Sequence, residues 1–298
     1  MGLFHFTNFA HLWQNIKVER DLAYGWEPDP QDDRNETYEF QTTWAAKASS
    51  SASSIDNSKY YKPISNQWHM PSCTANAGAD YLEAVDIYDK IRSGVDIYSA
   101  VANQPDYSRM FLWWNGRNEM DPPRIHDEKS GCYNRLIMDV AARFGVPEEK
   151  YWPYNEEKLP PLNRERPVVR PSVTAYRMAR PHTIERYHAL LGKDDARLEQ
   201  VIKALKANPG VLFGTALGEE FGSVGDKVLR IPKTTIARHA MVIVGYERSK
   251  AAFLVRNSHG LGFGIQENQE LRGYFWMHES YVAWSKTKSL WVCTKGAM

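Results

Sequence analysis

The sequence has no excess of charge of either sign. Of its 298 residues, 37 are basic and 36 are acidic, so the formal net charge is +1. A strongly basic surface is what draws a protein to nucleic acid or to an anionic membrane. The composition therefore gives no argument for either partner, and we expect a chain that binds neither nucleic acid nor membrane.

Long hydrophobic runs and a secretion signal are also missing. No stretch approaches the roughly 18 uninterrupted apolar residues of a membrane span. The first residues contain no basic segment, apolar segment or small-residue cleavage site of the secretory type. We therefore expect a cytoplasmic protein, and a viral particle or a host cell stays open as another location.

Cysteine is scarce, with one residue each at Cys73, Cys132 and Cys293. Three cysteines cannot build the disulfide framework of a small secreted domain. A single Cys132–Cys293 bridge stays open. The favoured interpretation is that both thiols are reduced and buried as small apolar side chains.

Metal and nucleotide motifs are absent from the sequence. The nine histidines form no His-Glu-x-x-His pattern, and no Cys-x-x-Cys pair exists, so a zinc site has little support. No glycine-rich phosphate loop of the Walker or Rossmann type occurs. We expect no cofactor, and the sequence leaves the oligomeric state open.

The chain is organised as a helical first part and a sheet-like second part. Residues 1–59 are expected to form an N-terminal extension that ends in a Ser/Ala-rich linker. A helical lobe over 60–154 and a β-rich lobe over 155–298 should follow. The fold class expected from this order is α+β.

Periodicity defines the individual elements. Apolar residues at helical spacing predict a helix that starts at Cys73 and has one buried face, and two further helices over 133–144 and 194–208. Short β-rich runs between turn residues predict strands over 211–214, 240–246, 252–256 and 273–277.

Cys73 follows Pro71-Ser72, a pair typical of a helix start, with Ser72 as the candidate N-cap. A cysteine is nucleophilic only as a thiolate. The unpaired N–H groups and dipole of a helix N-terminus lower the pKa of a thiol placed there. Cys73 is thus a candidate nucleophile, although a buried structural cysteine is the commoner reading of any single one.

His239 opens an apolar run that reads as a buried strand, with Arg248-Ser249-Lys250 as the turn and 253–256 as the returning strand. Antiparallel pairing about that turn predicts Asn257 opposite His239. An Asn oxygen beside an imidazole fixes the tautomer and orientation of the ring, as the third group of a catalytic triad does. Gln67, six residues before Cys73, has an amide able to donate to an oxyanion together with the backbone N–H of Cys73.

With these residues assembled, the chain resembles the papain family (C1) of cysteine peptidases, in particular the compact forms of bacteria and phages. The resemblance covers most of the chain from about Tyr24. The matching segments, in chain order, are Tyr24-Gly25-Trp26-Glu27-Pro28-Asp29, Ser72-Cys73-Thr74-Ala75-Asn76-Ala77, Arg109-Met110-Phe111-Leu112-Trp113-Trp114-Asn115, Gly145-Val146-Pro147, Tyr151-Trp152-Pro153-Tyr154, His239-Ala240-Met241, Val244-Gly245-Tyr246, Val255-Arg256-Asn257-Ser258 and Gly273-Tyr274-Phe275.

The resemblance implies a helical left lobe and a β-barrel-like right lobe, with the site in the cleft between them. It implies that Cys73 is the nucleophile, His239 the general acid/base, Asn257 its orienting partner and Gln67 the oxyanion donor. A peptide or protein substrate would lie extended across the cleft. Further residues expected at the substrate are Ser130, Gly131, Arg238, Ala240 and His259, of which Ser130-Gly131 stands where the family has Gly-Gly.

Three features depart from the family pattern. Pro71 stiffens the backbone before the nucleophile, and His259 stands where relatives have a Trp that shields the Asn–His hydrogen bond. The roughly 60 residues before Gln67 are too few for the long inhibitory prosegment of secreted relatives, so we expect control from elsewhere. These departures motivate a second hypothesis, a catalytically impaired papain-fold protein that serves binding or assembly. A third hypothesis keeps the same chemistry but changes the substrate to an isopeptide, a cell-wall peptide or another amide.

Overall fold

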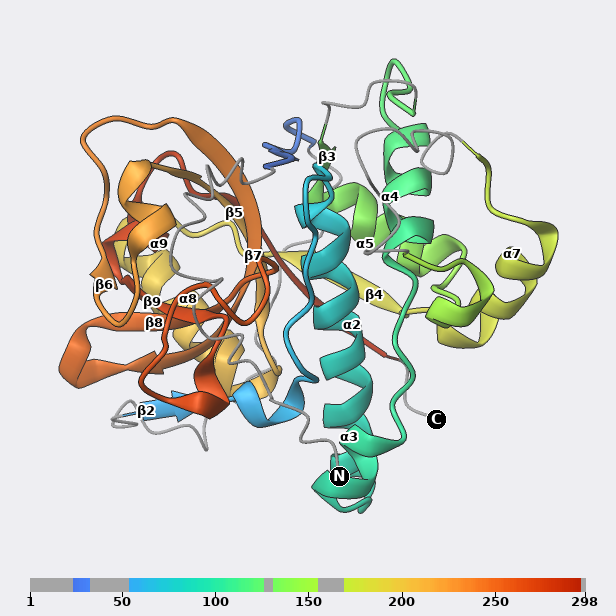
Figure 1. Cartoon of the computed structure of the whole chain (residues 1–298), viewed down its shortest axis with the longest axis horizontal. Helices are drawn as coiled ribbons and strands as arrows, with labels where there is room; N and C mark the ends of the chain where they lie inside the picture. Colours follow the sequence, from blue (N-terminus) through green and yellow to red (C-terminus); the bar gives the residue numbers. More distant parts are fainter. Residues whose placement is uncertain (1–23, 33–53, 126–130, 155–168, 296–298) are drawn as a thin grey trace, which may run out of the picture.

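The computed structural model describes residues 24–32, 54–125, 131–154 and 169–295, and shows two lobes side by side (Figure 1). Helices gather in one lobe and a large sheet in the other, which is the predicted α+β arrangement. The long helix α2 (Cys73–Arg92) stands between the lobes. Among the described residues no helix is both long and apolar enough for a membrane span.

The helical lobe is built around α2. The predicted helix over 133–144 is confirmed as α5 (Asn134–Arg143). Three helices lacked a prediction, namely α3 (Ile97–Ala102), α4 (Arg109–Asn118) and α7 (Val173–Ala179). Side-chain caps start these three, since Asp96, Ser108 and Ser172 each accept a hydrogen bond from a backbone N–H in the first turn.

Helix α2 starts at Cys73 as predicted, but the expectation of a single buried face is wrong. Every residue from Cys73 to Ile87 is buried. The reason is that both lobes pack against this helix, so no side of its first four turns faces water. Small residues make the close packing feasible: a Cβ at Gly78 would lie 2.3 Å from Ile137 Cγ2 of α5.

The β-rich lobe contains one large mixed sheet. Its strands, in spatial order, are β4 (Arg186–Ala189), β10 (Lys288–Thr294), β5 (Val211–Leu217), β7 (Ala237–Glu247), β8 (Ala252–Arg256), β9 (Tyr274–His278) and β6 (Val228–Leu229). The four predicted strands are confirmed as β5, β7, β8 and β9. The predicted helix over 194–208 is confirmed as α8 (Asp194–Ala207), and the short α9 (Ser280–Ala283) lies beside it.

The predicted hairpin of β7 and β8 is confirmed, but its register is not the expected one. Val242 pairs with Arg256 and Ile243 with Val255, and a bulge follows before Gly245. Continued to the open end, this register sets His239 opposite His259 rather than Asn257. Asn257 is therefore a diagonal neighbour of His239, which a side chain of its length can still reach.

The two lobes draw on sequence ranges that interleave. A division at residue 155 assigns helix α7 to the β-rich lobe, but this helix packs against the helical lobe. Its Tyr176 packs edge-to-face on Phe111 and donates to Asn115 Oδ1 at 2.6 Å. Strand β2 (Ser54–Asp56), from the end of the expected linker, pairs with β7. The linker before it lies outside the described residues.

A buried ionic cluster fastens the lobes together. Asp80 of α2 accepts from Arg109 of α4 at 2.7 Å and from Arg256 of β8 at 2.8 Å. Burial alone would raise the pKa of Asp80, but the two guanidinium groups hold it below its ordinary value. Arg256 also donates to the carbonyls of Lys62 and Pro63. The orientation of α2 relative to the hairpin is thus fixed by charge-assisted bonds.

Candidate active site

Cys73 is the first residue of α2, and its side chain is 0% exposed. Burial raises the pKa of the Cys73 thiol to about 11, despite backbone N–H groups of Ala240, Gly25 and Thr74 that favour the thiolate. The desolvation effect exceeds the helix-terminus effect predicted from the sequence. In this conformation the thiol is protonated at neutral pH.

Hydrogen bonds hold the backbone before the nucleophile. The indole of Trp113 donates to the Pro71 carbonyl at 3.1 Å, and Tyr154 donates from its hydroxyl to the Gln67 carbonyl at 2.8 Å. Ser72 is at the N-cap position as predicted, but its side chain caps no backbone N–H and instead bonds to Tyr154 at 3.0 Å. Pro71 is compatible with this loop, because the bond to Trp113 uses its carbonyl, whereas the backbone group that proline lacks is the N–H.

His239 and Asn257 meet at the open end of the β7–β8 hairpin. The ring Nε2–H donates to Asn257 Oδ1 at 2.7 Å, with both residues buried. The ring Nδ1 has no hydrogen-bond partner among the described residues. The next residue, Ala240, contacts Cys73 in one apolar cluster with Trp26. The free nitrogen of His239 is therefore available on the strand that lies against the nucleophile.

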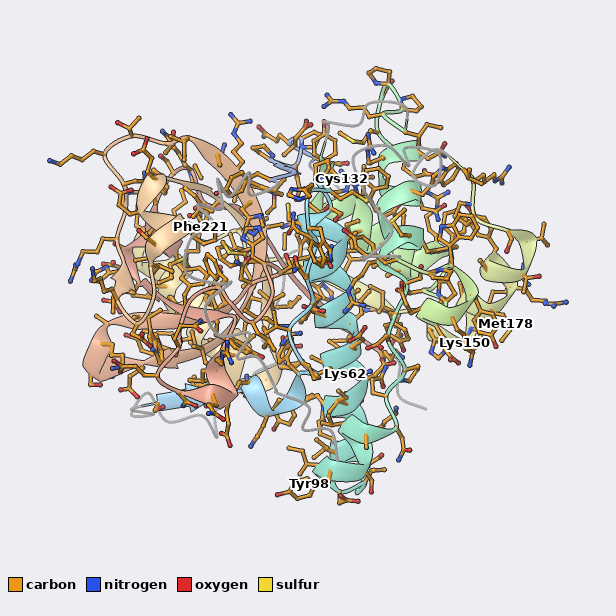
Figure 2. All side chains as sticks on the ribbon, in the orientation of Figure 1. Lys62, Tyr98, Cys132, Lys150, Met178 and Phe221 are labelled. Carbon is orange, nitrogen blue, oxygen red and sulfur yellow. The ribbon has the colours of Figure 1, made fainter. Side chains whose placement is uncertain are left out.

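His259 extends this pair into a chain of three side chains. Asn257 donates from Nδ2 to His259 Nδ1 at 3.0 Å, and the ring of His259 stacks on that of His239 at 4.7 Å and 21°. With Nδ1 accepting, His259 fixes which end of the amide points to His239. The replacement of the family's Trp by His259 suggested weaker shielding of the Asn–His hydrogen bond. In the structure His259, Tyr24 and Phe221 all have ring contacts with His239. Figure 2 shows Phe221 within the β-rich lobe.

The pKa of His239 lies well below its ordinary value, first because the ring is buried and second because His259 is close. Asn257 acts in the opposite direction, but more weakly. The resting site therefore contains a neutral thiol and a neutral imidazole, and the thiolate–imidazolium pair is unfavourable until water reaches it.

Gln67 is buried and forms hydrogen bonds to residues of both lobes. Its side chain donates from Nε2 to the Met70 carbonyl at 3.1 Å and accepts from the Ser258 hydroxyl at 2.6 Å. Its backbone N–H also donates to the Ser258 carbonyl at 2.8 Å. The segment after Asn257 thus orients Gln67, a contact between lobes that sequence reasoning missed.

A strand of the chain itself covers Cys73. Strand β1 (Trp26–Glu27) pairs in parallel with β3 (Cys132–Tyr133), and the Cys132 N–H donates to the Gly25 carbonyl at 2.8 Å. The indole of Trp26, 3% exposed, packs on Cys73 and Ala240. In Figure 1, β1 lies at the top of the junction between the lobes. No substrate can reach the thiol without displacing this strand.

Gly131 touches this covering strand, because a Cβ there would lie 1.6 Å from the Gly25 carbonyl oxygen. Ser130, which was expected to contact the substrate together with Gly131, lies outside the described residues. Ala240 is buried against the nucleophile, and Arg238 is exposed beside the site. A two-residue strand has no sequence signature, so the position of β1 was not predicted.

All three cysteines are free and buried. The Cys132–Cys293 disulfide that the sequence allowed is therefore not formed. In Figure 2 Cys132 lies close to the upper end of α2. Within the described ranges no cluster of His, Cys, Asp and Glu could hold a metal ion.

Comparison with known proteins agrees with the two-lobed fold. An uncharacterized peptidase C1-like protein of Acanthamoeba polyphaga mimivirus is 30% identical over 228 residues, which are 73% of this chain and 65% of that protein. Xylellain, a cysteine protease from Xylella fastidiosa, superposes with a TM-score of 0.72 and 25% identity, covering 92% of this chain and 97% of its own. The chain has a papain-like fold and is similar in sequence to a C1-like peptidase.

The papain-like fold recurs at lower identity. A procathepsin B from Trypanosoma congolense has a TM-score of 0.67 at 13% identity, covering 93% of this chain and 87% of its own. No family model matches the sequence. The papain-like chain spans just under two thirds of the viral relative's length, so that relative contains sequence outside the match.

Proposed function

We propose that the chain is a cysteine peptidase in which Cys73, His239 and Asn257 form the catalytic triad. One observation carries the proposal: the Asn257 amide orients an imidazole whose other nitrogen is unpartnered, on the strand that contacts Cys73. A thiol or a histidine alone would be structural. An oriented histidine, next in sequence to a residue that packs on a helix-start thiol, supports the pairing of base and nucleophile that acyl transfer needs.

The steps follow from these groups. The Cys73 thiol gives its proton to His239 Nδ1, and the thiolate adds to the substrate carbonyl carbon. The backbone N–H of Cys73 and the Gln67 amide stabilise the oxyanion. His239 then protonates the leaving amine as the C–N bond breaks, which leaves an acyl-thioester on Cys73. Water, deprotonated by His239, hydrolyses the thioester and restores the thiol.

The proposed enzyme is latent in this conformation, because β1 buries the thiol. Displacement of Trp26 would admit water, which lowers the pKa of Cys73 and raises that of His239 by restoring solvation. Both changes favour the thiolate–imidazolium pair. A substrate strand would then take the place of β1 beside Gly131.

Alkylation by an epoxide-type thiol-peptidase probe tests the proposal. The full chain is incubated with the probe at neutral pH, and adducts on the three cysteines are mapped by mass after digestion. We expect one adduct, on Cys73, with no labelling in the His239→Ala variant. Cys73→Ala is the blank. If Cys73 reacts equally fast with and without His239, the impaired, binding-only alternative is favoured.

A further inference from the structure

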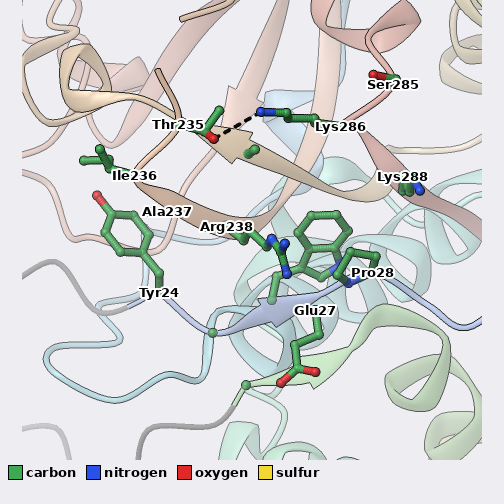
Figure 3. Close-up of a pocket in the computed structure, with 14 residues that line it drawn as sticks. Tyr24, Glu27, Pro28, Thr235, Ile236, Ala237, Arg238, Ser285, Lys286 and Lys288 are labelled. Carbon is green, nitrogen blue, oxygen red and sulfur yellow. Dashed lines mark hydrogen bonds between the residues drawn. The ribbon is translucent and has the colours of Figure 1, made fainter. Parts of the chain in front are cut away.

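A cavity of about 560 Å³ opens next to the nucleophile, between β1 and the β-rich lobe (Figure 3). One wall is the segment 24–28, whose Trp26 separates the cavity from Cys73. The opposite wall comes from β5, from residues 235–238 leading into β7, and from residues 285–288 leading into β10. We call this cavity the basic pocket, because its lining includes Arg238, Lys286 and Lys288.

Sheet register explains how the cations surround the pocket. Ala216 of β5 is paired with Arg238, and Gly214 of β5 is paired with Lys288. Paired residues of an antiparallel sheet point to the same face, and so do residues two apart on one strand. Gly214 and Ala216 therefore form the floor of the pocket. Arg238 lies beside Ala216, and Lys288 lies beside Gly214. Above the floor lies Trp26, so close that a Cβ at Gly214 would be 1.9 Å from its Cε2.

The pocket cations have no acidic partner in the described part of the chain. Lys286 donates only to the Thr235 hydroxyl, at 3.2 Å, as Figure 3 shows. The one carboxylate of the lining, Glu27, is turned toward Arg124 of the helical lobe, with 2.5 Å between Nη1 and Oε1. Like charges gathered in one pocket repel each other, and an anion that enters removes this repulsion.

We propose that the basic pocket binds an acidic side chain of the peptide substrate. This inference rests on the proposed peptidase function. Arg238 and Lys288 belong to strands of the sheet, and Lys286 lies two residues before Lys288. The wall with the three cations therefore stays in place when β1 leaves and a substrate strand lies beside Gly131. Arg238 directly precedes His239, so the acidic residue lies within a few positions of the scissile bond.

Matched peptides differing only by Glu or Gln provide the test. The Glu or Gln residue is placed in turn at each of the three positions on either side of the peptide bond that the full-length protein cleaves. At one position we expect the kcat/KM of the Glu peptide to be about tenfold higher than that of the Gln peptide. This is the gain that two or three partly exposed ion pairs provide. The triple variant Arg238→Gln, Lys286→Gln, Lys288→Gln should bring that ratio to about one. The exposed Lys227→Gln is the control and should keep the preference.

Binding of the same peptides to the Cys73→Ala chain, measured by fluorescence anisotropy, separates the pocket from the chemistry. Tighter binding of the Glu peptide, lost in the triple variant, supports the pocket even if no peptide is cleaved. In that case only the peptidase proposal fails. Cleavage or binding with equal preference for Glu and Gln at all positions would overturn the basic pocket and leave the peptidase proposal standing.

Discussion

Trp26→Ala should expose Cys73, because Trp26 packs on Cys73 and lines the adjacent cavity. The indole is 3% exposed and packs on Cys73, Ala240 and Gly214. Truncating a buried Trp to Ala costs about 3–5 kcal/mol of packing. Its Nε1–H, however, is buried without a partner among the described residues, which already costs about 1–3 kcal/mol.

The difference leaves a net contribution of about 2 kcal/mol to the docking of β1. Since about 1.4 kcal/mol is a factor of ten, Trp26→Ala should raise the population with an open site about 30-fold. If opening is fast relative to alkylation, the labelling rate of Cys73 rises by the same factor. The assay is the rate of Cys73 alkylation by a small probe at neutral pH, followed by mass.

An internal control comes with the chain. Cys293 is buried like Cys73 but lies on β10, away from β1. Its labelling should stay slow in Trp26→Ala. Cys132 is no control, because it pairs with Trp26 in the β1–β3 ladder. An unchanged rate at Cys73 would refute the covering role of β1. A parallel rise at Cys293 would instead indicate general loosening of the fold.

Further predictions concern the triad and the junction of the lobes. Asn257→Ala leaves His239 without its orienting partner and should lower kcat/KM by about 100-fold, measured on any cleaved peptide. Because the buried ring N–H of His239 loses its acceptor, the variant should also lose about 1–3 kcal/mol of unfolding free energy. His259→Phe removes a group that lowers the pKa of His239. The imidazolium then persists to higher pH, so the alkaline limb of kcat/KM should move upward, and a downward shift would contradict this electrostatic account. Arg256→Ala leaves Asp80 with one of its two guanidinium partners and should cost about 3–5 kcal/mol of unfolding free energy in urea titration. A loss below about 1 kcal/mol would show that Arg109 alone satisfies the carboxylate.

The sequence was sufficient to predict the helices and strands whose pattern is local. Helical spacing located α5 and α8, and β-rich runs bounded by turns located β5, β7, β8 and β9. The family motifs brought Cys73, His239 and Asn257 onto the elements where the structure has them. These inferences work because 3.6-residue and 2-residue periods report directly on which side chains face a core.

Other features depend on contacts distant in sequence, and no local pattern reports them. The turn lies further along the chain than predicted, with Glu247 paired to Ala252, and the bulge before Gly245 changes the pairing by one residue. The register at the open end therefore differs from the predicted one by two residues, yet Asn257 still reaches His239. The burial of α2 on all sides depends on both lobes at once. The covering strand β1 is only two residues long and pairs with β3, about a hundred residues away, so its role became visible only in three dimensions.

A cysteine peptidase of the proposed kind must form an acyl-enzyme on Cys73. Acid quenching of a reaction between the full chain and a peptide ester, followed by intact mass, tests it directly. The account predicts a species heavier by the acyl group, mapped to Cys73 and missing in Cys73→Ala. Turnover of the ester with no adduct on Cys73, or with an adduct elsewhere, would contradict it.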